Sequence, residues 1–135
     1  MVLLGSGDFI YEVSGNEWGS LPTGWEYNDA TAVTVDSKDR VYVFNRSANP
    51  VIVYDPEGNL LRSWGGDIFT MPHGITVDPD DFVYCADVGD HTVRKLTPDG
   101  KVLMTIGDPG KPAEAMSGFP FRAPTHVAVD PRNGE

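Results

Sequence analysis

Short apolar runs alternate along this chain with clusters of Pro, Gly, Asp and Asn, and the pattern is clearest in Met71–Gly107. Within that stretch the turn signals are Asp78-Pro-Asp-Asp81, Gly89-Asp90 and Pro98-Asp99-Gly100. Pro presets φ, Asp caps its own backbone and Gly accepts positive φ, so each cluster favours a tight turn. Short apolar runs bounded by such turns are typical of β-strands. We therefore predict four strands here, namely Gly74–Val77, Phe82–Ala86, Thr92–Leu96 and Lys101–Ile106.

The same unit occurs again on either side of this stretch. Val33-Thr-Val-Asp36 matches Ile75-Thr-Val-Asp78 at an offset of 42 residues, which holds throughout the upstream copy. A third copy begins at Pro124, where Pro124–Asp130 repeats Pro72–Asp78 at an offset of 52 residues. A period of about 40 residues with four strands per unit is typical of β-propeller blades. The strands predicted for the upstream copy are Ala32–Val35, Val41–Phe44, Val51–Tyr54 and Leu60–Trp64.

These repeats predict an all-β chain that forms part of a β-propeller. Since closed propellers typically have about 4–8 blades, we expect further blades or another copy of the chain to complete the ring. Phe9–Val13 is β-prone and could close the ring by pairing with a last blade, whose strands would lie after residue 135. The predicted parts are an N-terminal strand and loop at 1–29, blades at 30–65 and 71–107, and the start of the next blade at 123–135.

The charge and the cysteine content limit which partners and which cellular compartment fit this chain. The net charge of −10 argues against a nucleic-acid backbone or an anionic membrane surface as a partner. No apolar run approaches the length of a membrane span, and the first residues lack the features of a signal peptide. The single cysteine, Cys85, excludes an internal disulfide and lies in an apolar run, where it is expected to be a core residue. We therefore expect a cytoplasmic protein.

His73 is the first candidate for chemistry, because it precedes the innermost predicted strand of its blade. Thr31 and Thr125 occupy the same position in the other copies, and such positions converge at the mouth of a propeller channel. A neutral imidazole there could join other histidines around a metal such as zinc, or it could simply form a hydrogen bond. His91 and His126 fall at different repeat positions and supply no partner.

Arg46 and the segment Asp108–Arg122 are two further candidates. Arg46 follows the second strand of its blade, where its guanidinium could hold a carboxylate or form an ordinary surface ion pair. The Asp108–Arg122 segment is rich in Gly, Pro and Ala and separates the second and third copies, so it is predicted to be a loop on a rim of the propeller. Such a loop is either a binding loop or a tolerated insertion.

Several of these motifs resemble NHL-repeat six-bladed propellers, and among them the peptidyl-α-hydroxyglycine α-amidating lyase family and its bacterial relatives. The segments that carry the resemblance are Val33–Asp36, Val41–Arg46, Met71–Ile75, Ala86–Val88, His91–Val93 and Pro124–Val129. The resemblance implies a β-propeller of NHL type, with two four-stranded blades and the start of a third in this chain. It also implies cleavage of peptidyl-α-hydroxyglycine into a peptide amide and glyoxylate.

The resemblance further implies roles for particular residues. His73 would be the first of three zinc-binding histidines, and Arg46 would be the catalytic guanidinium that faces the substrate. The backbone carbonyls of Val33 and Ile75 would face a structural calcium ion in the channel. The other two histidines and a catalytic Tyr would lie after residue 135, so this chain alone is expected to be inactive.

The main hypothesis is a lyase-like propeller with a peptide or small-molecule substrate at the channel mouth. Two alternative functions remain open. One is a non-catalytic NHL scaffold that binds a peptide or protein on a rim and needs no metal at His73. The other is a lactonase-like hydrolase, which would hold calcium with side-chain Glu, Asn and Asp in the channel. Thr31, His73 and Thr125 at the channel-end positions disfavour the hydrolase.

Overall fold

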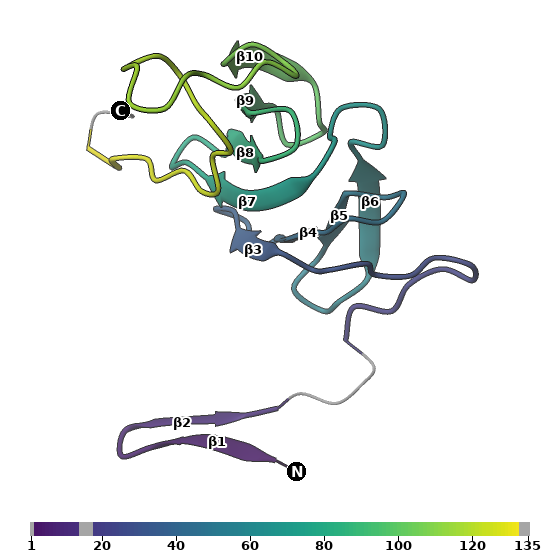
Figure 1. Cartoon of the computed structure of the whole chain (residues 1–135). Helices are drawn as coiled ribbons and strands as arrows, with labels where there is room; N and C mark the ends of the chain where they lie inside the picture. The colour runs from purple at the N-terminus through teal and green to yellow at the C-terminus, as the bar shows by residue number, and fades with distance from the viewer. Residues whose placement is uncertain (1, 14–17, 133–135) are drawn as a thin grey trace.

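The computed structural model describes residues 2–13 and 18–132, and all regular secondary structure within those ranges is β-strand (Figure 1). The strands are β1 (Leu3–Ser6), β2 (Phe9–Glu12), β3 (Ala32–Val35), β4 (Val41–Phe44), β5 (Val51–Tyr54), β6 (Leu60–Trp64), β7 (Pro72–Val77), β8 (Val83–Asp87), β9 (Thr92–Leu96) and β10 (Val102–Ile106). They form a two-stranded sheet, β1-β2, and two four-stranded sheets, β3-β4-β5-β6 and β10-β9-β8-β7. Every neighbouring pair is antiparallel, so each four-stranded sheet is a meander, as expected for a propeller blade. The predicted all-β propeller class is confirmed.

The first blade has the predicted strand bounds, and the second differs from them at three strands. Strand β7 begins at Pro72 rather than Gly74, because Pro72 pairs with Asp87 across a bulge. Proline is tolerated here because β7 is an edge strand and its missing N–H interrupts no ladder. Strand β8 is shifted by one residue, to Val83–Asp87, and β10 starts at Val102 rather than Lys101.

The two blades repeat even the geometry of their first turns. Asp36 Oδ1 accepts hydrogen bonds from the N–H groups of Lys38 and Arg40, and Asp78 Oδ1 accepts the same pair of bonds from Asp80 and Phe82. In the same turns, Asp39 and Asp81 adopt left-handed φ values of 57° and 65°, a conformation that Asp tolerates better than most residues. The offset of 42 residues is therefore a structural repeat as well as a sequence repeat.

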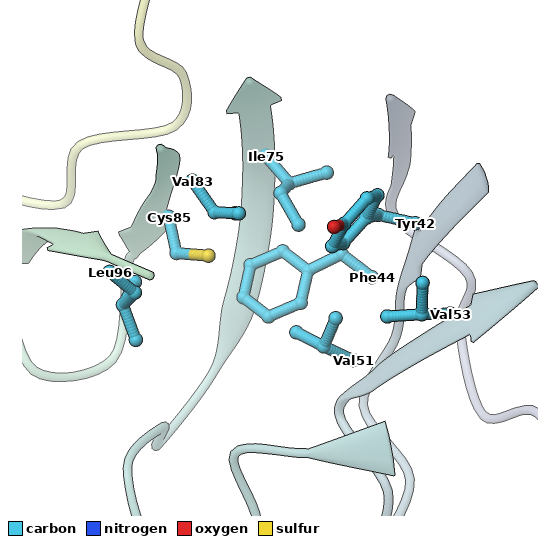
Figure 2. Close-up of a cluster of buried hydrophobic side chains, with 8 residues drawn as sticks. All are labelled: Tyr42, Phe44, Val51, Val53, Ile75, Val83, Cys85 and Leu96. Carbon is cyan, nitrogen blue, oxygen red and sulfur yellow. The ribbon is translucent and has the colours of Figure 1, made fainter. Parts of the chain in front are cut away.

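A hydrophobic core between the two blades holds them together (Figure 2). Its buried members come from both blades and are Tyr42, Phe44, Val51, Val53, Ile75, Val83, Cys85 and Leu96. Burying one such aliphatic or aromatic side chain stabilises a fold by roughly 1.5–3 kcal/mol. Burial also raises the pKa of the Cys85 thiol, which makes it a packed core residue rather than a nucleophile.

The blades are also joined by polar contacts at both ends of their strands. At one end, Asp81 accepts hydrogen bonds from the backbone N–H of Ser37 at 2.8 Å and from its hydroxyl at 2.7 Å. These two bonds lower the pKa of Asp81. At the opposite end, Arg46 Nε donates to the carbonyl oxygen of Pro72. We call this second end the His73 rim, because His73 follows Pro72 there.

The third copy lies along the innermost strand of the second blade without forming a strand itself. The Thr76 hydroxyl donates to the carbonyl oxygen of Val127 at 2.7 Å, and a Cβ added at Gly74 would lie only 2.4 Å from the carbonyl oxygen of Thr125. Glycine thus permits a close backbone approach. At the end opposite the His73 rim, a cavity of about 340 Å³ is lined by equivalent valines of all three copies, Val35, Val77 and Val129. The copies therefore surround one axis, as in a propeller.

The N-terminal strand has a hairpin partner that the sequence did not predict. Strand β2 forms a hairpin with β1, and neither strand contacts any other strand of the described chain (Figure 1). Pairing with a last blade stays a prediction. Downstream, Trp18 donates its Nε1–H to the carbonyl oxygen of Pro56, and its ring lies 5.4 Å from that of Tyr54, so this segment runs along the first blade.

Apolar side chains on the outermost strand of the second blade and on the innermost strand of the first remain exposed. Strand β10 is exposed along its whole length, and Val33 on β3 is 63% exposed. Neighbouring blades in a ring would cover such faces, so the need for further blades or a second copy stays a prediction. In residues 2–13 and 18–132 there is no helix long and apolar enough to cross a membrane.

Candidate functional site on the His73 rim

His73 lies near the start of β7 and is partly buried. Its ring Nδ1 is 3.0 Å from the carbonyl oxygen of Thr125 in the third copy. A carbonyl oxygen can only accept, so Nδ1 carries the proton in this contact. The neutral ring then has its lone pair on Nε2, which is the atom left to accept a proton or bind a metal.

Arg46 follows β4, and its side chain crosses to the second blade. Its Nε donates to the carbonyl oxygen of Pro72 at 3.2 Å, while Nη1 forms an ion pair with Asp29 Oδ2 at 3.2 Å. Its own backbone N–H donates to the carbonyl oxygen of Asn28 at 2.6 Å, which fixes where the side chain leaves the backbone. The structure thus brings Arg46 next to the residue that precedes His73. Sequence spacing did not predict this proximity.

A small polar cavity lies beside Arg46. It measures about 280 Å³, and its polar lining residues are Glu26, Asn28, Arg46, Ser47 and Asn49, with Trp25 as an apolar wall. The Arg46 side chain remains 30% exposed, and a guanidinium has five N–H donors, of which the contacts to Pro72 and Asp29 use two. The remaining donors could hold a carboxylate, while Glu26 would repel one that approached from its own side of the cavity.

Val33 and Ile75 occupy equivalent positions on the innermost strands β3 and β7. Just after these strands, Asp36 N–H donates to Arg40 O and Asp78 N–H donates to Phe82 O. These bonds show which residues of β3 and β7 are hydrogen-bonded to the neighbouring strand. Because paired and unpaired residues alternate along an antiparallel edge strand, the backbone groups of Val33 and Ile75 point away from their ladder partners. Their carbonyls therefore lie on the inner edges of the sheets, on the side away from the neighbouring strand, as a calcium site built from carbonyls in the channel would need.

Within residues 2–13 and 18–132, no three His, Cys, Asp or Glu side chains are grouped so that they could hold a metal. His73 has a carbonyl partner rather than a second imidazole, and the Nδ1 of His91 accepts the N–H of Ala123 at 3.1 Å. His126 is exposed and packs against Gly74. Since protein zinc takes three or four protein ligands, these residues alone do not form a zinc site.

A buried charged cluster in the second blade was missed from the sequence. The Arg94 guanidinium bonds to the carboxylate of Asp90, donates to the Thr92 hydroxyl at 2.7 Å and lies 3.9 Å from Asp87 Oδ2. Asp87 also accepts the backbone N–H groups of Thr70 and Met71. The cluster therefore fixes the linker that leads into β7 and positions His73 indirectly. The sequence did hold a signal for this cluster. Arg94 occupies the repeat position that the apolar residue Ile52 occupies in the first blade, so a charge stands where the repeat has a core residue.

Comparisons with known proteins agree with the repeat and the fold. Residues 69–96 match the NHL repeat family model. Peptidyl-alpha-hydroxyglycine alpha-amidating lyase 1 of Drosophila melanogaster is 47% identical over 75 residues, which are 53% of this chain and 13% of that protein. NHL repeat-containing protein 3 of Mus musculus is 35% identical over 126 residues, which are 82% of this chain and 36% of that protein.

A third relative, peptidyl-glycine alpha-amidating monooxygenase of Mus musculus, is 28% identical over 159 residues, covering 96% of this chain and 15% of that protein. The chain thus spans between 13% and 36% of the length of these relatives. The blades and the family match define the class, which is an all-β chain of NHL-type propeller blades. Within that class the chain is similar to the peptidyl-α-hydroxyglycine α-amidating lyases, and the predicted resemblance is confirmed.

Proposed function

We propose that this chain is part of a lyase-like NHL propeller that acts on peptidyl-α-hydroxyglycine at the His73 rim. The observation that carries the proposal is the contact of Arg46 Nε with the carbonyl oxygen of Pro72, which brings a guanidinium and the His73 imidazole to one rim. The 47% identity to the Drosophila lyase supports this choice of reaction class. The non-catalytic scaffold is not favoured, because the name of NHL repeat-containing protein 3 states no binding partner and so gives that alternative no positive support.

The reaction breaks the bond between the amide nitrogen and the α-carbon of the terminal hydroxyglycine. The hydroxyl loses its proton and its oxygen becomes the aldehyde oxygen of glyoxylate, while the amide nitrogen keeps the C–N electron pair and gains a proton. In this proposal the free donors of Arg46 hold the terminal carboxylate in a bidentate contact. The Nε2 lone pair of His73 faces the hydroxyl side of the substrate.

Zinc and calcium are proposed cofactors of the complete ring. His73 would supply one zinc ligand, and the carbonyls of Val33 and Ile75 would supply calcium ligands. The described residues do not complete either site, so no step of the reaction is derived through a metal. The test is metal content by mass spectrometry on the protein at its natural length, with His73→Ala compared with His126→Ala. Zinc lost only in His73→Ala supports the assignment, and zinc retained in that variant contradicts it.

The proposed activity is tested with two peptides that differ in one atom. An acylated peptide ending in α-hydroxyglycine and the same peptide ending in glycine are incubated with the protein at its natural length, and products are identified by mass. We expect peptide amide and glyoxylate in equal amounts from the first peptide and no reaction of the second. Binding of the first peptide without products would contradict the lyase and favour the scaffold.

A further inference from the structure

The segment between the second and third copies, residues 108–123, forms a structured loop on the His73 rim, which we call the rim loop. Its first turn is closed by the bond from Lys111 N–H to the carbonyl oxygen of Asp108 at 2.9 Å. The N–H of Gly110 donates to the carbonyl oxygen of Asp90 at 2.9 Å, which ties this turn to the second blade. At the other end, the N–H of Ala123 donates to His91 Nδ1 at 3.1 Å. The loop is therefore anchored to the blade at both ends.

The rim loop lines an open cavity of about 510 Å³, a volume within the usual range of roughly 300–1,000 Å³ for small-ligand sites. Its apolar walls are Pro112, Ala113, Phe119 and Pro120. Phe119 is 78% exposed, which leaves an aromatic ring available at the edge of the cavity. An exposed aromatic side chain beside a preformed apolar hollow is characteristic of a binding surface.

The charges around the cavity select against anionic groups. Lys111 is the one cation among the lining residues, whereas Asp108 and Glu114 supply two carboxylates. The chain as a whole carries a net charge of −10. A neutral apolar side chain therefore fits this cavity better than an acidic one.

The cavity lies close to the proposed catalytic rim along the chain. Thr125, whose carbonyl oxygen contacts His73, comes five residues after Pro120 in the cavity wall. Five residues span at most about 17 Å when fully extended, so a bound peptide of only a few residues can reach from one to the other. The reacting α-hydroxyglycine is the last residue of its peptide, so the rest of the bound peptide extends from the site only in the amino-terminal direction.

We propose that the rim-loop cavity is a subsite for an apolar side chain of the peptide, on the amino-terminal side of the α-hydroxyglycine. This inference rests on the proposed lyase function and adds the substrate class to it. Phe119 and the prolines pack against the side chain, and the carboxylates of Asp108 and Glu114 disfavour Asp and Glu at the same position. The subsite explains why the chain has a longer connection here than between its first two blades.

The test is a position scan in serine peptides that end in α-hydroxyglycine. A single Phe, or a single Asp, replaces each of the four preceding residues in turn, and kcat/KM is measured with the protein at its natural length. We expect Phe at one position to raise kcat/KM about 10-fold, mainly through KM, and Asp there to lower it. Phe119→Ala should abolish the preference for Phe over Ser at that position. Met116→Ala, a fully exposed residue of the same loop outside the cavity, should keep the preference.

Each remaining outcome decides against the proposal. Equal rates for all peptides, or a preference for Phe that survives Phe119→Ala, would overturn the subsite and leave the lyase intact. Loss of the preference for Phe in Met116→Ala as well would assign the preference to the loop as a whole and contradict its assignment to the cavity. Turnover of no peptide at all would overturn the lyase and the subsite together.

Discussion

The Arg46 guanidinium of the first blade is held against the second blade, because its Nε donates to the carbonyl oxygen of Pro72 at a distance of 3.2 Å. The next residue is His73, whose Nδ1 bonds in turn to Thr125 of the third copy. One chain of contacts therefore connects all three copies on the same rim. Any rotation between the blades would change the spacing of the two candidate side chains.

Replacing Arg46 with Lys should impair activity far more than stability. Lysine keeps the charge but loses the planar fork that can hold both Pro72 and a carboxylate, so we expect kcat/KM to fall about 100-fold. The ion pair with Asp29 is exposed, so the free energy of unfolding should change by no more than about 1 kcal/mol. Steady-state kinetics and urea denaturation measure the two effects. Arg62→Lys, a partly exposed cation on β6, is the matched control, and an equal loss of activity in it would contradict the assignment.

The two histidines that anchor the third copy should have opposite tautomers when neutral. His73 donates from Nδ1 to a carbonyl, whereas His91 accepts an N–H at Nδ1, so its own proton is on Nε2. Long-range proton–nitrogen correlation NMR distinguishes the two tautomers directly. A proton on Nε2 of His73 would show that the contact with Thr125 is not formed, and it would remove the argument for Nε2 as the reactive atom.

Arg94→Met should destabilise the protein by about 3 kcal/mol. The substitution leaves Asp90 without its cation in a buried cluster, and breaking one partner of a buried ion pair typically costs about 3–5 kcal/mol. The carboxylate of Asp87 keeps the hydrogen bonds that it accepts from four backbone N–H groups, which places the estimate at the low end of that range. Chemical denaturation measures the loss. Arg62→Met is the control, and a comparable loss there would mean that the cluster has no special role.

Tyr42 should make stability decline in alkaline solution. Burial and the hydrogen bond of its hydroxyl to Asp36 raise the pKa of Tyr42 to about 12, above the value of about 10 for an unfolded chain. Because the folded state releases this proton later than the unfolded state, its contribution is complete below about pH 10 and is lost as the pH rises toward 12. Urea midpoints at pH 9 and pH 11 measure the decline.

Tyr42→Phe separates this effect from general alkaline unfolding. At neutral pH we expect the variant to be less stable by about 1 kcal/mol, since it lacks the bond to Asp36. Between pH 9 and pH 11 it should lose less stability than the wild type. Tyr11→Phe, an exposed residue of the N-terminal hairpin, should behave as the wild type. A decline in Tyr42→Phe as steep as in the wild type would contradict the linkage.

The repeat made most strands predictable, because turns and alternating side chains are local features of sequence. The third copy forms no strand at Pro124–Asp130 because a strand needs a ladder partner, which the apolar pattern does not supply. The hairpin partner Leu3–Ser6 was missed because a four-residue strand has too little periodicity to detect. The contact of Arg46 with Pro72 depends on how two blades dock, so it could not be derived from spacing along the chain.

Glyoxylate release by His73→Ala decides whether catalysis belongs to the His73 rim. The wild-type protein at its natural length and the variants His73→Ala and His126→Ala are compared on one acylated peptidyl-α-hydroxyglycine, after confirming equal folding by circular dichroism. We expect wild type and His126→Ala to release glyoxylate at similar rates, whereas the rate of His73→Ala should fall by at least about 100-fold. A His73→Ala variant that retains the wild-type rate would contradict the assignment of catalysis to this rim.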